Sequence, residues 1–291
     1  MSVPATDTSL RASSTMGVPH AASRLGVPPP HRFALHRRRA SLAGMPSTVQ
    51  IRRAADRAVT TTSWLTSRHS FSFGDRYDPA NTHHGVLLVN NDDVVQPATG
   101  FDTHPHRDME IVTWVLDGAL AHRDSAGNSG VVYPGLAQRM SAGTGILHSE
   151  KNDSDTEPVR FVQMWVLPDV LGIAPGYQQH EIGDEVLDGR LATIASGMPG
   201  HDAAIVIHNR SAALHAARLR SGDGVALPAV PYLHLFVARG LLTLPGPDTA
   251  VELAEGDAVR FTASDGIRVT AREACEILVW EMHATLGNIA T

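Results

Sequence analysis

From residue 85 onward the chain alternates short β-branched or apolar runs with clusters of Gly, Pro, Asn and Asp. Runs of this length between turn-forming residues are typical of β-strands, and no convincing amphipathic helix interrupts them. The runs include GVLLVNNDD, EIVTWVLDG, GVVYPG and VRFVQMWVLP. The pattern predicts an all-β fold, either a sandwich or a barrel.

One pair of runs is predicted to form a hairpin. The segment DSAGNSG (124–130) consists almost wholly of turn-forming residues and separates ALAHR from GVVYP. Such a link lets two strands lie antiparallel beside each other. We expect the runs on either side of it to pair.

The chain contains an internal repeat. PGLAQRMSAGTG (134–145) aligns with EGDAVRFTASDG (255–266) with five identities in twelve positions, at an offset of 121 residues. Upstream, VTWVLDGAL and HLFVARGLL share a valine and a glycine at an offset of 122. Two blocks at nearly one offset indicate two copies of one β unit. We therefore predict an N-terminal domain over 46–172, a linker over 173–185 and a C-terminal domain over 186–291.

The composition excludes several classes of protein. At 291 residues the chain is long enough for two domains of ordinary size. Apolar residues make up 43% of it and charged residues 19%, and no segment has the roughly 20 consecutive apolar residues of a membrane helix. A single cysteine, Cys275, excludes an internal disulfide and a cysteine-rich metal cluster. We expect a cytoplasmic protein that does not span a membrane.

Residues 1–45 differ from the rest of the chain. They hold six arginines against one acid, a run of three prolines and no apolar periodicity, so their composition cannot form a core. We expect either a mis-called start, with Met45 as the true one, or a disordered extension. Without this segment the 24 basic and 30 acidic residues fall to 18 and 29, which gives the remaining chain a formal charge of −11. Such a charge argues against direct binding of nucleic acid.

Two short motifs carry the candidate chemistry. In THPH (103–106) two imidazoles lie two residues apart, and in HSE (148–150) an imidazole and a carboxylate do the same. Side chains at i and i+2 of a strand point to the same face, so each pair can face one interior point. Three neutral nitrogens and one carboxylate suit a divalent first-row metal with coordination positions left open. The sequence predicts one mononuclear metal site formed by His104, His106, His148 and Glu150.

The repeat provides an internal control for this site. At the two offsets the four predicted ligands correspond to residues that do not bind metals, namely Ala226, Pro228, Val269 and Ala271. The C-terminal copy is therefore predicted to lack a metal site. His234 corresponds to Val112 and is interpreted as structural. Four further isolated histidines are interpreted as surface or core residues: His69, His180, His208 and His215.

Several stretches of the chain resemble the pirin branch of the cupin superfamily. The most specific are HPHRDMEIVTWVLDG, AHRDSAGNSG and SAGTGILHSEKN, and WLTSRHSFSFGDRYDP and PGYQ add to the likeness. The resemblance is specific over about residues 47–180 and looser towards the C-terminus. It implies a bicupin, which consists of two stacked antiparallel β-barrels of jelly-roll type, with the metal in the N-terminal pirin domain.

Two comparisons with the family concern the site. Pirins differ from other cupins in the position of the carboxylate ligand, and this chain differs from pirins after the HPHR motif. Pirins take their carboxylate ligand from the residue two after the second-motif histidine, which is Glu150 here, whereas Glu110 lies nearer the general cupin position. Glu110 is therefore the alternative carboxylate, as a ligand or as a partner of one. Where the family often reads HPHRGFE, this chain has Asp108 and Met109. If Asp108 lines the mouth of the pocket, the preferred substrate differs in size or charge.

The resemblance implies two different functions. Bacterial members are associated with quercetin 2,3-dioxygenase activity, in which a metal and O2 open the ring of a flavonol, and other members bind transcription or metabolic proteins. The metal implied first is Fe(II), with Mn, Ni, Cu, Co and Zn as alternatives. In the enzyme, Glu150 is the expected catalytic base for the flavonol hydroxyl. The alternative is a metal-dependent regulatory or redox-sensing module that binds a partner protein, and in either case we expect a monomer.

Apolar walls are needed to hold a flat aromatic substrate and exclude water. Five side chains near the ligands are candidates for such walls, and each is equally compatible with ordinary barrel core: Phe101, Met109, Trp114, Met140 and Met164. Arg107 and Asp124 either orient the ligand imidazoles or lie in solvated loops. A sealed apolar pocket beside the metal favours the enzyme, and a shallow site beside an exposed apolar patch favours the binding module.

Overall fold

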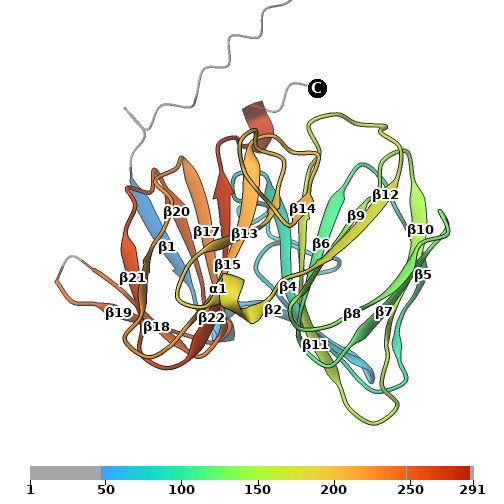
Figure 1. The fold of residues 1–291 in the computed structure, drawn as a ribbon, viewed down its shortest axis with the longest axis horizontal. Helices are drawn as coiled ribbons and strands as arrows, with labels where there is room; N and C mark the ends of the chain where they lie inside the picture. The colour runs from blue at the N-terminus through green and yellow to red at the C-terminus, as the bar shows by residue number, and fades with distance from the viewer. Residues whose placement is uncertain (1–46, 247, 289–291) are drawn as a thin grey trace, which may run out of the picture. The chain divides into compact units, whose positions relative to one another are not determined.

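The computed structural model describes residues 47–246 and 248–288 of the chain. These residues form two β-barrels, each made of a seven-stranded and a four-stranded sheet (Figure 1). Strand pairing is antiparallel except between β13 (Ala192–Ser196) and β14 (Ile205–Val206). The predicted all-β fold of two barrels is confirmed. The prediction for residues 1–45 lies outside the described residues.

In the N-terminal barrel the large sheet has the strand order β12-β9-β6-β11-β4-β3-β2, and the small sheet has the order β5-β10-β7-β8. The strands are β2 (Ala58–Thr61), β3 (Leu65–His69), β4 (Leu87–Val95), β5 (Gly100–His106), β6 (Glu110–Asp117), β7 (Leu120–Asp124), β8 (Ser129–Val132), β9 (Leu136–Ser141), β10 (Ile146–Asn152), β11 (Val159–Val166) and β12 (Gly176–Glu181).

In the C-terminal barrel the orders are β1-β20-β17-β22-β15-β13-β14 and β16-β21-β18-β19. The remaining strands are β1 (Thr48–Arg52), β15 (Ala212–Leu219), β16 (Gly224–Ala226), β17 (Tyr232–Arg239), β18 (Leu241–Leu244), β19 (Val251–Ala254), β20 (Ala258–Thr262), β21 (Arg268–Ala271) and β22 (Cys275–Met282). The helical segments are α1 (Asp184–Leu187) and two short 3-10 turns at Ala54–Asp56 and Leu286–Asn288. No helix in the described part of the chain is long and apolar enough to cross a membrane.

The two barrels repeat one topology. When β6 is matched to β17 and β9 to β20, each strand of the first pair of sheets has a counterpart at the same place in the second pair. The duplication predicted from the repeated blocks is thus visible in the strand order. The predicted hairpin is also confirmed, because β7 and β8 pair from Leu120 opposite Val132 to Arg123 opposite Ser129.

Two strands belong to other barrels than the predicted domain boundaries indicated. β1 falls within the predicted first domain but pairs with β20 of the second barrel, from Thr48 opposite Thr262 to Arg52 opposite Ala258. The predicted linker 173–185 contains α1 and also β12, which pairs with β9 of the first barrel. Both are edge strands without a fully buried side chain. The barrel that an edge strand joins is set by its backbone pairing, and the alternation of TVQIR in β1 does not specify that partner.

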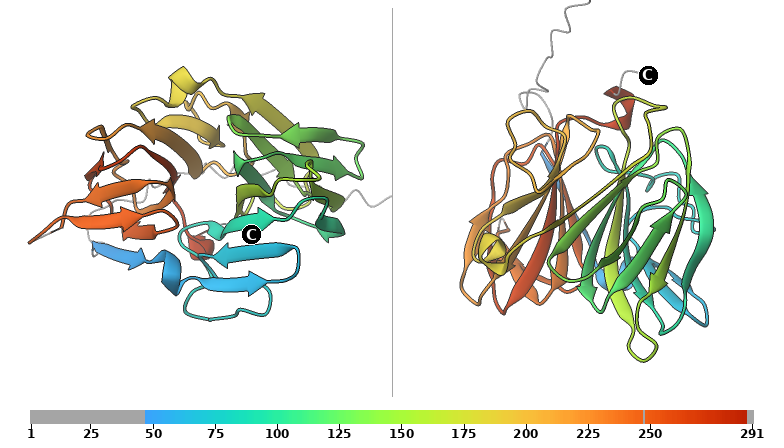
Figure 2. Two further views of the ribbon diagram at one scale, coloured as in Figure 1. Left: turned by 90° about the horizontal axis from the view of Figure 1, so that it is seen from below. Right: turned by 45° about the vertical axis from the view of Figure 1, so that its right-hand side comes forward.

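The large sheets of the two barrels lie face to face (Figure 2). Alternate residues of β6 face the interior of the first barrel, and those between them, such as Trp114, join an apolar layer with Phe236 and Trp280 of the second barrel. Across this layer Trp114 Nε1 donates to Glu276 Oε1 at 2.6 Å, and Trp280 Nε1 donates to Met164 Sδ at 3.2 Å. Trp114 and Met164, which the sequence offered as pocket walls, therefore belong to the interface between the barrels.

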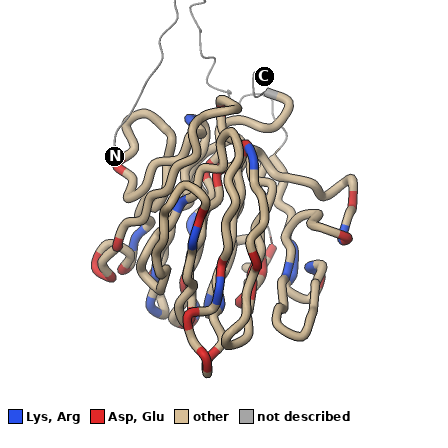
Figure 3. The backbone as a smooth tube through the Cα atoms, turned by 90° about the vertical axis from the view of Figure 1, so that its right-hand side faces the viewer, with Lys and Arg blue, Asp and Glu red and all other residues tan. Residues whose placement is uncertain are grey.

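The interiors of the two barrels differ in polarity. The second barrel is filled by a continuous apolar cluster that includes Leu235, Leu242 and Val269. In the first barrel, two separate and smaller apolar clusters leave space for buried polar side chains between the sheets, Asn91 and Gln163 among them. Outside, acidic and basic residues are interspersed over the side of the N-terminal barrel (Figure 3). The polar interior of the first barrel is where the predicted metal ligands lie.

Candidate metal centre

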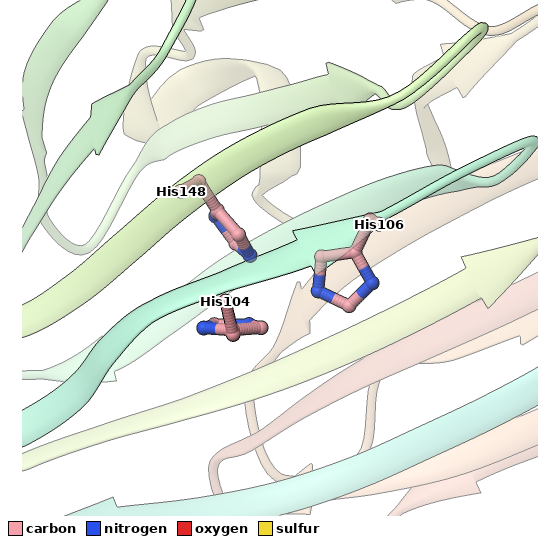
Figure 4. Close-up of side chains that lie close together, drawn as sticks. All are labelled: His104, His106 and His148. Carbon is pink, nitrogen blue, oxygen red and sulfur yellow. The ribbon is translucent and has the colours of Figure 1, made fainter.

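Three of the predicted ligands converge inside the N-terminal barrel. His104 and His106 lie on β5, and His148 lies directly opposite His104 on the neighbouring strand β10. The ring centroids are 4.8 Å apart for His104 and His106, 4.4 Å for His104 and His148, and 4.9 Å for His106 and His148. Figure 4 shows the three imidazoles reaching into the same space from the two strands. The i,i+2 spacing therefore places His104 and His106 together, and the pairing of β10 with β5 adds His148.

The hydrogen bonding of these rings leaves nitrogen atoms free. His104 Nδ1 donates to the carbonyl oxygen of Asp102 at 2.7 Å, which fixes the proton there and leaves its Nε2 with a lone pair. The Nε2 atoms of His106 and His148 are buried and have no hydrogen-bond partner among the residues that the structure describes. A buried nitrogen without a partner is costly, and a metal ion would satisfy it.

The same burial keeps the imidazoles of His106 and His148 neutral. Desolvation, reinforced by the neighbouring His104, lowers the pKa of His106 to about 4. Desolvation together with the rings of His104, His106 and His122 lowers the pKa of His148 to about 2. A neutral imidazole is the form that binds a metal. The donor set is thus ready at neutral pH.

Glu150, the fourth predicted ligand, lies beside this group and not within it. Its carboxylate is buried and accepts a hydrogen bond from Gln163 Nε2 at 2.7 Å, and desolvation raises its pKa to about 7. Within the described residues, the donors that lie within 4.8 Å of one another form two groups that share His148. One consists of the three histidines, and the other joins His148 to Glu150 and His122. Glu150 therefore has to turn from Gln163 to complete the predicted set.

His122 was not predicted from the sequence. It lies on β7 opposite Glu150 and is 1% exposed. Its ring centroid lies 5.3 Å from that of His148, and Tyr177 stacks on it at 4.9 Å. A weak signal was present, because Leu120, His122 and Asp124 alternate along one strand and Leu120 is apolar. The alternation indicates a face, but it does not say which strand His122 would meet.

The structure also shows the surroundings of Glu110, Arg107 and Asp124. Glu110, the alternative carboxylate, is buried but accepts hydrogen bonds from Ser141 Oγ at 2.9 Å and His208 N at 3.1 Å, and it belongs to neither donor group. Glu110 is thus bonded to Ser141 and His208, whereas the carboxylate grouped with His148 is that of Glu150. Arg107 has a side chain 72% exposed and is a solvated loop residue, whereas the Asp124 side chain is fully buried beside His122.

Asp108, which replaces the glycine of the common HPHRG pattern, has a local role in the loops at the end of β5. Its backbone has φ 49°, a conformation that favours glycine but that aspartate tolerates. Its carboxylate accepts a hydrogen bond from Gly172 N at 2.6 Å, and its own amide donates to the carbonyl of Gly143 at 2.9 Å. Asp108 therefore joins two loops at the end of β5, and no contact of it reaches the imidazoles.

The remaining wall candidates lie at two places beside the imidazoles. Phe101 lies with its ring centroid 6.2 Å from that of His104. Met109 and Met140 pack with Trp165 in one apolar cluster, and Trp165 contacts His106 edge-on at 4.9 Å. These side chains provide apolar surroundings, and Met140 is fully buried core.

Two hollows adjoin the site. An open groove of about 480 Å³ runs along the β5 and β10 rim and includes His106; its other lining residues are Pro105, Arg107, Ser125, Gly145, Ile146 and Leu147. A more enclosed cavity of about 60 Å³ lies between β3, β4 and β11 and is lined by Asp93, Phe101 and Gln163, among others. Only the groove is large enough for a drug-sized ligand.

The second barrel shows what the same positions become without a metal site. Val225 pairs with Val269 as His104 pairs with His148, so the counterparts of His104 and His106 are Val225 and Leu227, one residue before those given by the 122-residue offset. Leu242 pairs with Ala271 as His122 pairs with Glu150. The counterpart positions all belong to one apolar core cluster. The same fold therefore accommodates apolar side chains at the positions where the first barrel has histidines and a glutamate.

Comparison with protein families matches both halves of the chain. The family model described as Pirin matches residues 51–166, and that described as Quercetinase C-terminal cupin domain matches residues 193–282. A Mycobacterium tuberculosis protein with a provisional quercetin 2,3-dioxygenase name is 72% identical over 247 residues, which cover 85% of this chain and 100% of that protein. The Escherichia coli K12 protein named quercetin 2,3-dioxygenase is 34% identical over 235 residues, which cover 80% of this chain and 98% of that protein.

Solved structures show the same likeness. The bacterial pirin YhhW of Escherichia coli, in complex with nickel(II), superposes with a TM-score of 0.74 at 32% identity, covering 82% of this chain and 100% of YhhW. A quercetin 2,3-dioxygenase from Acinetobacter baumannii shares the fold at a TM-score of 0.61 and 16% identity, covering 80% of this chain and 78% of that one. The fold thus recurs in proteins similar to this chain, and one of them, YhhW, was solved in complex with nickel(II).

Proposed function

The chain belongs to the pirin family, and from that premise we propose that it is a metal-dependent dioxygenase of the quercetin 2,3-dioxygenase type, which opens a flavonol with O2. One observation carries the proposal. Three imidazoles converge beside a buried carboxylate, with unpartnered Nε2 atoms on His106 and His148, in the barrel whose duplicate is filled with apolar side chains. A cluster of this kind costs free energy unless it binds something.

We assign the metal to His104, His106 and His148 through their Nε2 atoms, with Glu150 as the fourth ligand. When bound, a divalent first-row ion supplies positive charge that favours the deprotonated substrate and a redox centre for O2. Fe(II) is our first choice, with Mn, Ni, Cu, Co and Zn as alternatives. The nickel(II) complex of YhhW supports a bound metal ion in this family, and it keeps nickel among the candidates.

The groove beside His106 is our candidate for the substrate. Its volume of about 480 Å³ accommodates a flat aromatic molecule, and Pro105, Ile146 and Leu147 provide apolar contact. The Arg107 guanidinium at the rim is positioned to attract a phenolate. In the state in which it does not bind the metal, Glu150 is our candidate for the base that takes the flavonol hydroxyl proton, because it is the carboxylate beside the imidazoles.

The test is oxygen uptake by metal-loaded protein with quercetin. Glu150→Gln is expected to lower the turnover per bound metal on the order of 100-fold or more and to change the KM little, since the amide has the size of the carboxylate but cannot take the proton. Metal content has to be measured in the variant because Glu150 also contributes charge to the site. Equal turnover per bound metal in the variant would contradict the assigned base.

One observation favours a second function, a metal-dependent regulatory or redox-sensing module that binds a partner protein. The groove is open, His104 and His106 are only partly buried, and Leu147 beside them is 47% exposed. If wild-type protein loaded in turn with iron, manganese, nickel and copper consumes no oxygen with any flavonol, this second function becomes the better one. For either function we propose a cytoplasmic monomer, consistent with the single buried thiol of Cys275.

A further inference from the structure

A chain of buried polar groups leads away from the metal centre behind His148. His148 Nδ1 lies 3.5 Å from His122 Nδ1, and His122 Nε2 lies 3.4 Å from Asp124 Oδ2. The two strands hold this order, because β10 and β7 pair with His148 opposite Asp124 and Glu150 opposite His122. His122, His148 and Asp124 are each almost completely removed from solvent.

Asp124 is held as an acceptor at the far end of the chain. Its Oδ1 accepts hydrogen bonds from Ala126 N at 2.9 Å and Asn128 N at 3.0 Å, and its Oδ2 accepts one from Asn128 Nδ2 at 2.9 Å. Burial opposes its ionisation, but the donors of Asn128, His122 and Ala126 outweigh burial and lower the pKa of Asp124. A carboxylate in this state has no proton to give, so the proton between Asp124 and His122 resides on His122 Nε2.

The position of the proton on His122 then determines the position of the proton on His148. A neutral imidazole with its proton on Nε2 has a lone pair on Nδ1, so His122 Nδ1 accepts and His148 Nδ1–H donates. His148 is left with its lone pair on Nε2, which is the buried atom without a partner that faces the other two imidazoles. We infer that His122, oriented by Asp124, is a positioning residue that selects Nε2 of His148 as the metal-binding atom. This inference rests on the proposed metal centre and adds to it a residue that contacts no metal itself.

The surroundings of His122 fit this role. Tyr177 stacks on its ring with 27° between the planes, which restricts the ring orientation. The counterpart in the second barrel is Leu242, so the fold accepts an aliphatic side chain at this position. Ligand histidines in general are oriented by a hydrogen bond to their other ring nitrogen, and loss of such a partner typically weakens metal binding 10–100-fold.

The alternative is that His122 is itself a ligand, since His122, His148 and Glu150 form a donor group of their own. In that case His148 binds a second ion through Nδ1 and no proton lies between the two rings. The two arrangements differ in metal stoichiometry and in the protonation of His148 Nδ1, and both are measurable.

The first measurement is the affinity and stoichiometry for nickel(II), by competition titration, in wild type and three variants. His122→Leu, the side chain of the second barrel, removes the acceptor and is expected to weaken binding 10–100-fold at one ion per chain. His122→Asn offers Oδ1 as an acceptor near the position of Nδ1 and is expected to recover at least part of the affinity. Asp124→Asn can donate to His122 Nε2 and so reverse the tautomer, and weakened binding is expected.

The second measurement is the protonation state of the His122 and His148 ring nitrogens in metal-free protein, from nitrogen-15 NMR. We expect the proton on Nδ1 of His148 and on Nε2 of His122. Wild-type affinity in both His122→Leu and Asp124→Asn, a proton on His148 Nε2, or two ions per wild-type chain would overturn the inference. Neither measurement uses oxygen consumption, so both still test the role of His122 if the protein proves not to be a dioxygenase. If the wild type binds no nickel, the metal centre fails while the NMR result still decides the tautomers.

Discussion

At the scale of single residues, burial alone does not identify a ligand. His148 and His234 are both buried and both have ring nitrogens without hydrogen-bond partners. His148 faces two further imidazoles, whereas His234 lies against Phe71 in the layer between the barrels. The two histidines therefore differ in the side chains that surround each ring, and substitutions can test this difference.

The first prediction compares these two histidines. His148→Ala is expected to abolish stoichiometric metal binding, because it removes the residue shared by both donor groups. His234→Ala is the matched control and is expected to retain full metal content, although it leaves a cavity that lowers stability. Elemental analysis of the purified proteins checks both. Full metal content in His148→Ala would rule out the assigned site.

The second prediction concerns His234 and pH. Burial, with the charges of Arg260 and His84 adding to it, lowers the pKa of His234 well below its ordinary value. The folded state therefore keeps this ring neutral, while the unfolded chain binds a proton below pH of about 6.5. Because the unfolded state then binds more protons, the wild type loses stability as pH falls through this range, by up to roughly 1.4 kcal/mol per pH unit for this group.

His234→Leu removes that proton uptake and the unpartnered nitrogens. The variant is expected to match or exceed the wild type in unfolding free energy at a pH of about 7.5, and to exceed it by more at about 5.5. Urea unfolding curves at the two pH values give the comparison. A difference between variant and wild type that stays the same at both pH values would contradict the burial of a neutral His234.

At the scale of elements, the two edge strands show how each barrel is completed. β1 closes the large sheet of the second barrel against β20, as β12 closes that of the first against β9. β1 is also tied down at its end, where Arg53 Nη1 contacts Asp257 Oδ2 at 2.7 Å. An uncovered strand edge invites pairing with other chains. β1 therefore stabilises a barrel whose other strands lie more than 130 residues further along the chain.

The third prediction follows from β1. A chain starting at Ala54 lacks β1 and is expected to melt roughly 5 °C or more below the full-length protein and to aggregate more readily. Its metal content should remain, because the metal centre lies in the other barrel. A chain starting at Met45 retains β1 and is the control, with the melting temperature and metal content of the full-length protein. Similar melting curves for the two shortened chains would contradict the role of β1.

At the scale of the whole molecule, the two barrels share a core. The layer between the large sheets contains buried residues of both barrels, Trp114 and Trp280 among them. A polar contact crosses it as well, since Arg160, whose Nε and Nη2 bind Asp92 of its own barrel, also donates from Nη2 to the carbonyl oxygen of Ala238 in the second barrel. We expect the two barrels to unfold together in one cooperative transition, because neither large sheet keeps its apolar face covered without the other.

The fourth prediction tests this interface against the alternative that Trp114 lines the substrate pocket. Trp114→Phe keeps an aromatic ring but removes the indole donor from the buried carboxylate of Glu276, which is expected to cost about 1–3 kcal/mol of unfolding free energy. Metal content, and the KM for quercetin in an active enzyme, should not change. Denaturant unfolding and elemental analysis give the two readouts. An altered KM with unaltered stability would instead place Trp114 in the pocket.

Periodicity and turn chemistry were enough to predict the strands that bury one face, the β7–β8 hairpin and the duplication. They did not assign β1 and β12 to their sheets, because the partner of an edge strand is set by backbone pairing, which a local pattern does not specify. The i,i+2 spacing brought His104 and His106 to one face, and the pairing of β10 with β5 brought His148 to them. Glu110 as the alternative carboxylate stays a prediction, and His122 was missed, since its surroundings depend on which neighbouring strand its side chain meets.

The sequence by itself therefore determined local properties: which residues lie on strands, which side chains share a face, and that one copy of the repeat carries donors while the other carries apolar residues. The tertiary structure decided what those faces meet. It placed Trp114 and Met164 between the barrels, turned Glu150 towards Gln163, and set His122 behind His148. Strand register and sheet packing join positions far apart along the chain, and a local pattern holds no record of which distant strand will lie alongside.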